Sequence, residues 1–158
     1  MDAPTIHRIL KEEKIGMLRL SLTDLLGVHK SVEIPSSRAD DALSGRIVFD
    51  GSSIEGFIRE KESDVRLVPD PETFSVVTWE GAEKIGRLVC DLALHDGAPY
   101  PVCTRSILKQ TVARLAEKGL SVEIRPEIEF FLFDRKDGQP TTETSDNGGY
   151  FDMTPGDA

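Results

Sequence analysis

The sequence contains no apolar run of about 18 residues, the shortest that reads as a membrane-spanning helix. Its first residues, MDAPTIHRILKEEK, lack the apolar core of a secretory signal. Positive charge is also scarce, because 19 basic residues face 28 acidic ones for a net charge of −9. A chain with this charge repels phosphate backbones and anionic lipid. We therefore expect a cytoplasmic protein that binds neither nucleic acid nor membranes.

Cysteine and histidine, the side chains typical of zinc and redox sites, are few. Cys90 lies in the apolar run IGRLVCDLAL and Cys103 stands directly before an expected helix, with no CxxC spacing. His7, His29 and His95 are scattered singly, with no HxxxH pair. We expect reduced, structural thiols and surface histidines, although a lone histidine can still act beside groups that are distant in sequence.

The chain does contain enough apolar sequence for a core, at 39% hydrophobic residues, and its 158 residues fit one domain or one small domain plus part of another. The segment HDGAPYPVCT, punctuated by Gly97, Pro99 and Pro101, is the best boundary candidate. Before it, the apolar periodicities predict a helix over 4–14, a hairpin of GMLRLSL with VHKSVEI, a short helix capped by Ser36 or Ser37 and ending at Gly45, and strands over 73–79 and 85–94.

After the boundary, Thr104 can cap a helix that closes at Gly119, with Leu108, Val112 and Leu115 on one face. A strand is expected next, over residues 121–133, and KDGQP then turns the chain back. Residues 141–158 are polar and glycine-rich and predict no regular element.

The expected strand contains RPEIEFFLFD, in which an apolar run holds Glu127 and Glu129 two positions apart. Strand side chains alternate, so the two carboxylates would share a face with Cα atoms about 6.6 Å apart. Buried without a partner they would repel each other at a cost of several kcal/mol. Spacing alone leaves two interpretations open, a pair of ligands for Mg²⁺ or Mn²⁺ and a solvated face of an edge strand.

A second candidate is the polar stretch FDGSSIEGF. Asp50 precedes Gly51, and Ser52 and Ser53 can bond the backbone locally, which is typical of a turn. The functional interpretation places a carboxylate and a hydroxyl on a loop, where they can accept a proton or bind a small cation. Arg59, further along the same loop, is by default a solvated side chain.

The stretches FDGSSIEGF, ESDVRLVPDPETF, RPEIEFFLFD and GGYFDMTPGD, in this order and at these separations, closely resemble the N-terminal part of bacterial and archaeal type I glutamine synthetases. Four ordered motifs of this length are specific, whereas any one alone is not. The resemblance implies an α+β fold. It comprises a β-grasp N-terminal domain over residues 1–100, followed over 101–158 by the first helix and strands of a truncated catalytic domain of the glutamine synthetase/guanido kinase-like type.

The resemblance also implies a reaction. Glutamine synthetases phosphorylate the γ-carboxylate of glutamate with ATP, and ammonia then displaces the phosphate from γ-glutamyl phosphate. Two divalent metals, Mg²⁺ or Mn²⁺, hold the phosphates, and the family's ExE strand supplies one carboxylate to each. By the resemblance Glu127 and Glu129 are these metal ligands.

Further site residues follow by position in the same motifs. Asp50 and Ser53 match the positions that bind ammonium, with Asp50 as the proton acceptor, and Tyr150 matches the tyrosine of the ammonium pocket. Asp64 matches an acidic position that helps order the flap over the glutamate site. Arg59 falls where the feedback-inhibited subgroup carries an arginine that responds to glutamine. Family members form homo-oligomers, dodecamers of two hexameric rings, in which neighbouring subunits share each active site.

The chain departs from the family in two positions and in length. Arg125 stands where the family usually has glycine, and Ile128 where proline is common. The remaining metal ligands and the nucleotide site of the family lie downstream of Ala158, so we expect an N-terminal portion that is inactive alone. Two alternatives stay open: a ligase of the same superfamily that joins glutamate to a polyamine or other amine, and a short non-catalytic module that binds or regulates a full-length synthetase.

Overall fold

A computed structural model describes residues 1–54, 56, 64–78 and 83–153 of the chain. The chain divides into two compact units, Met1–Val122 and Glu123–Ala158, which are described separately below. The first unit is built on a five-stranded sheet and the second contains a two-stranded hairpin.

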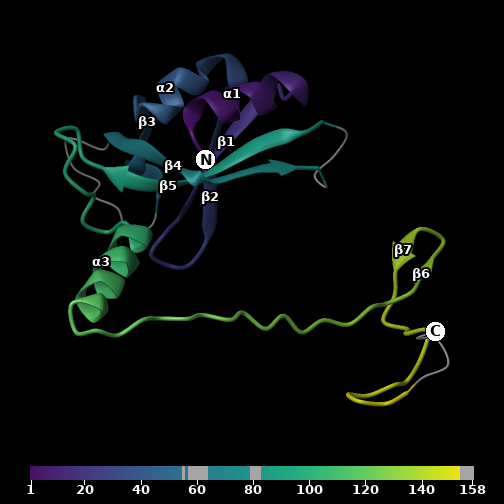
Figure 1. Cartoon of the computed structure of the whole chain (residues 1–158). Coiled ribbons are helices and arrows are strands. Elements are labelled where there is room, and N and C mark those ends of the chain that lie inside the picture. Colours follow the sequence, from purple (N-terminus) through teal and green to yellow (C-terminus); the bar gives the residue numbers. More distant parts are fainter. Residues whose placement is uncertain (55, 57–63, 79–82, 154–158) are drawn as a thin grey trace. The chain divides into compact units, whose positions relative to one another are not determined.

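The sheet of the first unit mixes parallel and antiparallel pairs (Figure 1). Its strand order is β2-β1-β5-β4-β3, with β1 parallel to β5 and every other pair antiparallel. The strands are β1 Met17–Thr23, β2 His29–Pro35, β3 Ile47–Asp50, β4 Asp64–Val77 and β5 Ile85–Ala93. The pair β1–β5 therefore joins two parts of the chain that are far apart in sequence.

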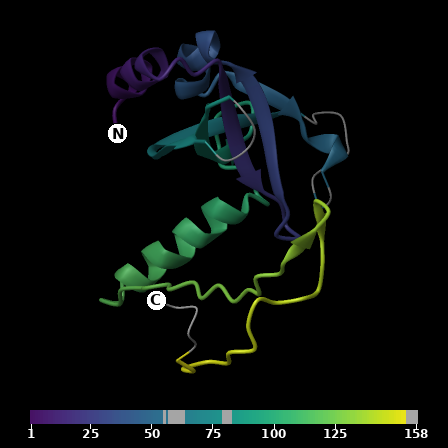
Figure 2. The ribbon, with the colours of Figure 1, turned by 90° about the vertical axis from the view of Figure 1, so that its right-hand side faces the viewer.

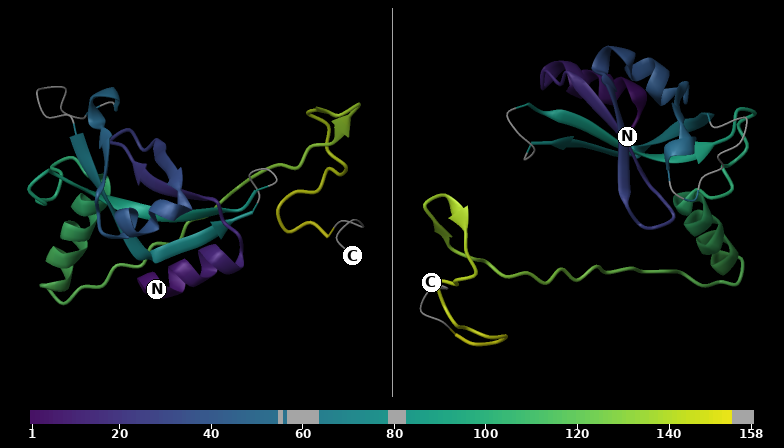
Figure 3. Two further views of the ribbon diagram at one scale, coloured as in Figure 1. Left: turned by 90° about the horizontal axis from the view of Figure 1, so that it is seen from above. Right: turned by 180° about the vertical axis from the view of Figure 1, so that it is seen from behind.

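Helices α1 (Ala3–Glu12) and α2 (Ala39–Leu43) lie on one face of this sheet (Figures 1 and 3). Helix α1 begins where Asp2 Oδ1 accepts the backbone N–H of Thr5 at 3.0 Å, and it buries Ile6 and Leu10 one turn apart. They meet alternate residues of the strands, which form the core: Leu18, Leu20, Leu22, Val65, Leu67, Leu88, Cys90 and Leu92. None of the helices in the described ranges is both long enough and apolar enough to cross a bilayer.

The hairpin β1–β2 confirms the sequence prediction, with Thr23 opposite His29 at its closed end (Figure 2). Its TDLLG turn is organised by Asp24, whose buried Oδ1 accepts the backbone N–H groups of Leu26 at 2.9 Å and Val28 at 2.8 Å. A carboxylate that satisfies two turn amides replaces the ladder bonds lost at the turn.

Strand β4 begins nine residues before the strand predicted over 73–79. Pro69 and Pro71 disfavour a strand there, since proline cannot donate to a ladder. The structure accommodates them because β3 pairs only with residues 64–67 of β4, so that the prolines lie where one side of β4 is an edge. The ladder to β5 also breaks between Asp70 and Ser75, in a bulge. Trp79, the end of the predicted strand, lies outside the described residues.

The cap predicted for the short helix is wrong. Ser36 and Ser37 belong to a 3-10 turn, η1 (Ser36–Arg38), and the cap position of α2 is Arg38, with no side-chain bond to the helix. The predicted end is right, because Gly45 adopts φ +67 just after the helix.

Helix α3 (Thr104–Ala116) also has a different start from the one predicted. Cys103 occupies the cap position, and the hydroxyl of Thr104 instead donates to the carbonyl of Thr23 at 2.9 Å. The hydroxyl group that was expected to cap the helix thus forms a tertiary hydrogen bond with the backbone of Thr23 instead. Gly119, at φ +73, ends the helix as predicted.

The second unit contains the hairpin β6 (Arg135–Lys136) and β7 (Gln139–Pro140). Its turn, Asp137–Gly138, has positive φ at both residues, which is the geometry of a tight hairpin turn and confirms the turn predicted at KDGQP. The strand predicted over residues 121–133 is wrong for this structure, because these residues form no ladder. A strand needs a neighbour for its backbone groups, and no strand within the described ranges is paired with this segment.

The apolar side chains of this segment are consequently in solvent. Ile124, Ile128, Phe130, Phe131 and Leu132 are each at least 73% exposed. Residues 124–133 thus present apolar surface, and we name Ile124 to Phe133 the apolar segment.

We predict that Gly86→Ala lowers the free energy of unfolding by about 1–3 kcal/mol, because a Cβ there would lie 2.8 Å from Leu18 Cδ2 and 3.1 Å from Leu10 Cδ2. Chemical denaturation measures the change. Gly16→Ala is the matched control, since its Cβ would meet nothing within 4 Å. Equal stability of the two variants would contradict the packing described for Gly86.

The exposed apolar segment also predicts that the purified chain self-associates in a concentration-dependent way. Replacing Phe131 and Phe133 by serine should shift the chain toward monomer in sedimentation velocity. Phe151→Ser is the control, because Phe151 is fully exposed but lies outside the apolar segment. A wild-type chain that stays monomeric at high concentration would show this expectation to be wrong.

Candidate functional site

Two of the predicted site residues, Asp50 and Asp64, are brought together by the sheet. They are register partners at the end of the β3–β4 ladder, where the polar loop leaves β3 and returns as β4. Residues directly opposite in an antiparallel pair point to the same face, with Cβ atoms about 4.5–5.5 Å apart. Both are exposed. A cation that bound between two such carboxylates would reduce the repulsion of their like charges.

Asp50 also organises the start of the loop. Its Oδ1 accepts the backbone N–H of Ser52 at 2.9 Å, and η2 (Gly51–Ser53) follows directly. Ile54, which ends this turn with a bond to the carbonyl of Gly51 at 3.0 Å, is buried in the core. The predicted local turn is therefore present. A carboxylate has about four acceptor positions, so this bond is compatible with cation binding by the same group.

Two further predicted site residues, Ser53 and Arg59, belong to the same stretch of sequence. Ser53 is the last residue of η2. Arg59, the predicted glutamine-responsive residue, lies outside the described residues.

The tip of hairpin β1–β2 meets this loop at a position that sequence reasoning did not single out. Gly56 adopts φ +81, and a Cβ built on it would lie 2.7 Å from Leu25 Cδ1. Leu25 therefore packs directly against the backbone of Gly56. The available signal was the glycine of SSIEGF, since glycine is favoured where the backbone takes a positive φ or approaches another group closely.

Glu127 and Glu129 lie in the second unit and are exposed. No cluster of three or more histidine, cysteine or acidic side chains suited to a metal occurs within the described ranges, so this pair has no further ligand there. Arg125, one of the departures from the family pattern, places its Nη2 3.5 Å from Glu123 Oε2. Carboxylate oxygens are suitable ligands for Mg²⁺ or Mn²⁺, so the two glutamates fit the predicted metals in donor type.

Tyr150 also lies in the second unit and is exposed, with its ring tilted against that of Phe151 at 6.4 Å between centroids. The backbone beside it is turned, because the N–H of Gly149 donates to Asp152 Oδ2 at 2.9 Å. Tyr150 remains 78% exposed despite these contacts.

The cysteines take no part in any candidate site. Cys90 and Cys103 are both free and buried, as predicted. Burial raises the pKa of the Cys90 thiol to about 12, so it carries no thiolate at neutral pH. The backbone N–H of Leu92 donates to Cys103 Sγ at 3.4 Å, which is a structural role.

Comparison with known protein families accounts for both parts of the chain. The model of the glutamine synthetase β-grasp domain matches residues 14–95. The model of the glutamine synthetase catalytic domain matches residues 101–158. The chain belongs to the glutamine synthetase family. The predicted fold class, α+β with an N-terminal β-grasp domain, is thereby confirmed, and the resemblance given by the four motifs is confirmed with it.

Relatives of this glutamine synthetase family chain are similar over nearly its whole length. It is 48% identical over 151 residues to a glutamine synthetase of Halobacterium salinarum, covering 94% of this chain and 33% of that protein. It is 47% identical over 156 residues to a glutamine synthetase of Thermus thermophilus, covering 95% of this chain and 35% of that protein. The chain thus spans about a third of the length of the curated relatives it matches.

A solved structure shares the fold as well. The structure of a GmaS/ADP complex superposes with a TM-score of 0.63 at 29% identity, over 71% of this chain and 25% of that one. The likeness therefore extends to a protein that was solved with a bound nucleotide.

We predict that Gly56→Ala lowers the free energy of unfolding by more than Gly27→Ala does. Both glycines have φ near +80, so both substitutions carry the left-handed backbone cost of about 1–2 kcal/mol. Only the Cβ at Gly56 meets Leu25, whereas that at Gly27 meets nothing within 4 Å. In a Leu25→Ala background the difference between the two, measured by chemical denaturation, should disappear. A difference that persists there would contradict the Leu25 contact.

Proposed function

We propose that this chain is the ammonium-binding, metal-ligand-bearing N-terminal portion of an ATP-dependent glutamate–ammonia ligase that forms glutamine through γ-glutamyl phosphate. The observation that carries the proposal is the pairing of Asp50 with Asp64 at the mouth of the loop, in a domain of the glutamine synthetase family. The family matches support a boundary near residue 100, with the β-grasp domain before it and the start of the catalytic domain after it.

Asp50 is the proposed ammonium-binding group and proton acceptor. Two facing carboxylates attract NH₄⁺ by charge, and a carboxylate can take the proton that is released as the amine attacks. Ser53 and Tyr150 are the proposed hydroxyl-bearing residues of ammonium binding, and Asp64 is proposed to help order the flap over the glutamate site. Each assignment rests on position within the family motifs.

Glu127 and Glu129 are the proposed ligands of two divalent metals, Mg²⁺ or Mn²⁺. Such ions, when bound, stabilise the negative charge of the transferring phosphoryl group. What the chain itself contributes is a pair of carboxylates two residues apart, on a segment that requires a neighbour to become a strand. The role of ATP as co-substrate is supported by the likeness to GmaS, which was solved in complex with ADP.

The proposed partners are those of a complete synthetase: glutamate, ammonium and ATP as substrates, and further copies of the enzyme in a dodecamer whose active sites are shared between neighbours. We also propose a cytoplasmic location and a response to glutamine through Arg59.

The 158-residue chain is expected to have no ligase activity of its own, because it holds only part of the proposed site. Glutamine formation from glutamate, ammonium and ATP by the purified chain should equal the control without enzyme. Activity above that control would show that the chain contains a complete site.

The proposed function is best tested in a chimera that joins residues 1–158 to the remaining two thirds of the Halobacterium salinarum relative. We expect this chimera to form glutamine. Asp50→Asn should raise the KM for ammonium by at least about tenfold, because the substitution removes the charge that binds the cation. Asp137→Asn, in the exposed turn of the β6–β7 hairpin and outside the β3–β4 ladder, is the control.

Three outcomes would count against the proposal. An inactive chimera that folds and assembles would oppose the assignment as a ligase portion. An unchanged KM for ammonium in Asp50→Asn would oppose the ammonium site. Faster turnover with a polyamine or another amine than with ammonium would assign the chain to an amine ligase of the same superfamily.

A further inference from the structure

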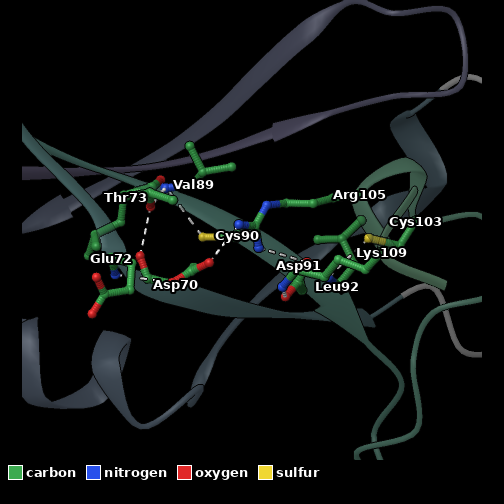
Figure 4. Close-up of polar contacts among 11 residues, drawn as sticks. Asp70, Glu72, Thr73, Val89, Cys90, Asp91, Leu92, Cys103, Arg105 and Lys109 are labelled. Carbon is green, nitrogen blue, oxygen red and sulfur yellow. Dashed lines mark hydrogen bonds and ion pairs between the residues drawn. The ribbon is translucent and has the colours of Figure 1, made fainter. Parts of the chain in front are cut away.

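Helix α3 is attached to the face of the sheet opposite α1 and α2 by a cluster of charges (Figure 4). Arg105, in its first turn, places Nη2 2.6 Å from Asp70 Oδ2 on β4 and Nη1 3.0 Å from Asp91 Oδ1 on β5. One turn later, Lys109 Nζ lies 2.5 Å from Asp91 Oδ2. One guanidinium thus spans two strands, and a second cation binds the shared carboxylate.

The cluster is better placed than an ordinary surface ion pair. The side chains of Arg105, Asp70 and Asp91 are each no more than 24% exposed, and hydrogen bonds between a charged donor and a charged acceptor are stronger than those between neutral groups. Asp70 and Asp91 are diagonal neighbours across the β4–β5 ladder, so without a cation they would repel each other. The bond from Arg105 lowers the pKa of Asp70, which keeps that carboxylate charged.

A β-bulge and local hydrogen bonds fix the position of Asp70 in β4. The ladder between β4 and β5 is interrupted from Asp70 to Ser75, and Thr73 fills the gap. The Thr73 hydroxyl donates to the carbonyl of Asp70 at 2.7 Å and accepts the backbone N–H of Val89 at 2.8 Å. The backbone N–H of Glu72 donates to Asp70 Oδ1 at 3.0 Å, which leaves Oδ2 directed to Arg105.

Beyond its first turns, α3 has little else to hold it. It contains no buried residue, and Leu108 and Val112 on its apolar face are exposed. The remaining polar tie from the helix to the sheet among the bonds described is that from Thr104 to Thr23. Among the described residues, the polar contacts from the helix to the sheet are therefore those of Thr104, Arg105 and Lys109.

We propose that Arg105 and Lys109 form an electrostatic latch that fixes the start of the catalytic part on the β-grasp sheet. Asp70 and Asp91 lie within the part that matches the β-grasp domain, and Arg105 and Lys109 within the part that matches the catalytic domain. The latch thus lies across the junction of the two domains. Arg105 is a positioning residue, because it acts through the helix and not on a substrate.

The latch is tested in the 158-residue chain by measuring the distance between spin labels on Ser75→Cys in β4 and Lys118→Cys after α3. Both positions are exposed, whereas the native cysteines are buried. We expect a narrow distance distribution in the otherwise unaltered chain and a shifted, wider one in Arg105→Gln. Sodium chloride at 1 M, where the screening length is about 3 Å, should widen the first distribution and leave the second unchanged.

Controls separate the latch from a general loss of structure. Arg114, at the far end of α3, forms no ion pair among the described residues. Arg114→Gln removes a cation there and should leave the distance distribution narrow. Arg105→Lys keeps the charge but lacks the planar guanidinium that contacts Asp70 and Asp91 at once. This variant should give a distance distribution of intermediate width. In a double-mutant cycle, Asp70→Asn should add little to Arg105→Gln, because Arg105 is the cation that contacts Asp70.

The proposal is overturned if Arg105→Gln keeps the narrow distribution with an unchanged circular dichroism spectrum, or if Arg114→Gln widens it equally. If Arg105→Gln does not fold, the test uses Arg105→Lys and the response of the unaltered chain to salt. A distance distribution that changes neither in Arg105→Lys nor in 1 M sodium chloride overturns the proposal. None of these readouts involves ligase activity, so their outcome is independent of the proposed function.

Discussion

The parallel contact between β1 and β5 is the interaction on which the rest of the first unit depends. It joins the N-terminal hairpin to the antiparallel strands β3, β4 and β5, which would otherwise be a separate sheet. Gly86, opposite Leu18 in this ladder, makes the contact close, because the absent side chain leaves room for Leu10 and Phe74. The helix, both halves of the sheet and the core therefore meet at one glycine.

Alternation of apolar residues predicted much of this fold, including the β1–β2 hairpin and β5, because one face of each strand is buried. It could not predict the first part of β4, where Pro69 and Pro71 are tolerated only because β3 is short. Nor could it predict which strands pair across the chain. The strand expected around Glu127 was predicted from the same alternation and is absent. A strand also needs a neighbouring strand to pair with, and the alternation of apolar residues does not show whether one is present.

The candidate site shows the same division. Motif order identified the family, and the structure added that the sheet register brings Asp50 opposite Asp64, where the end of β3 meets the start of β4. Glu127 and Glu129 gain no comparable support from the described residues, because their segment is unpaired. The charge cluster at Arg105 had no sequence signal, since its members are on three separate elements. Together these features describe a β-grasp domain in which Asp50 faces Asp64 at the end of a strand ladder, followed by a helix, α3, whose first two turns form ion pairs with the sheet.

We propose that this chain supplies two metal ligands, Glu127 and Glu129, to a glutamine synthetase site. The anomalous diffraction of Mn²⁺ in crystals of the chimera with the Halobacterium salinarum relative tests this proposal. We expect two manganese peaks, one in contact with a carboxylate oxygen of Glu127 and the other with one of Glu129. Manganese peaks bound only by other residues, with Glu127 and Glu129 in solvent, would contradict it.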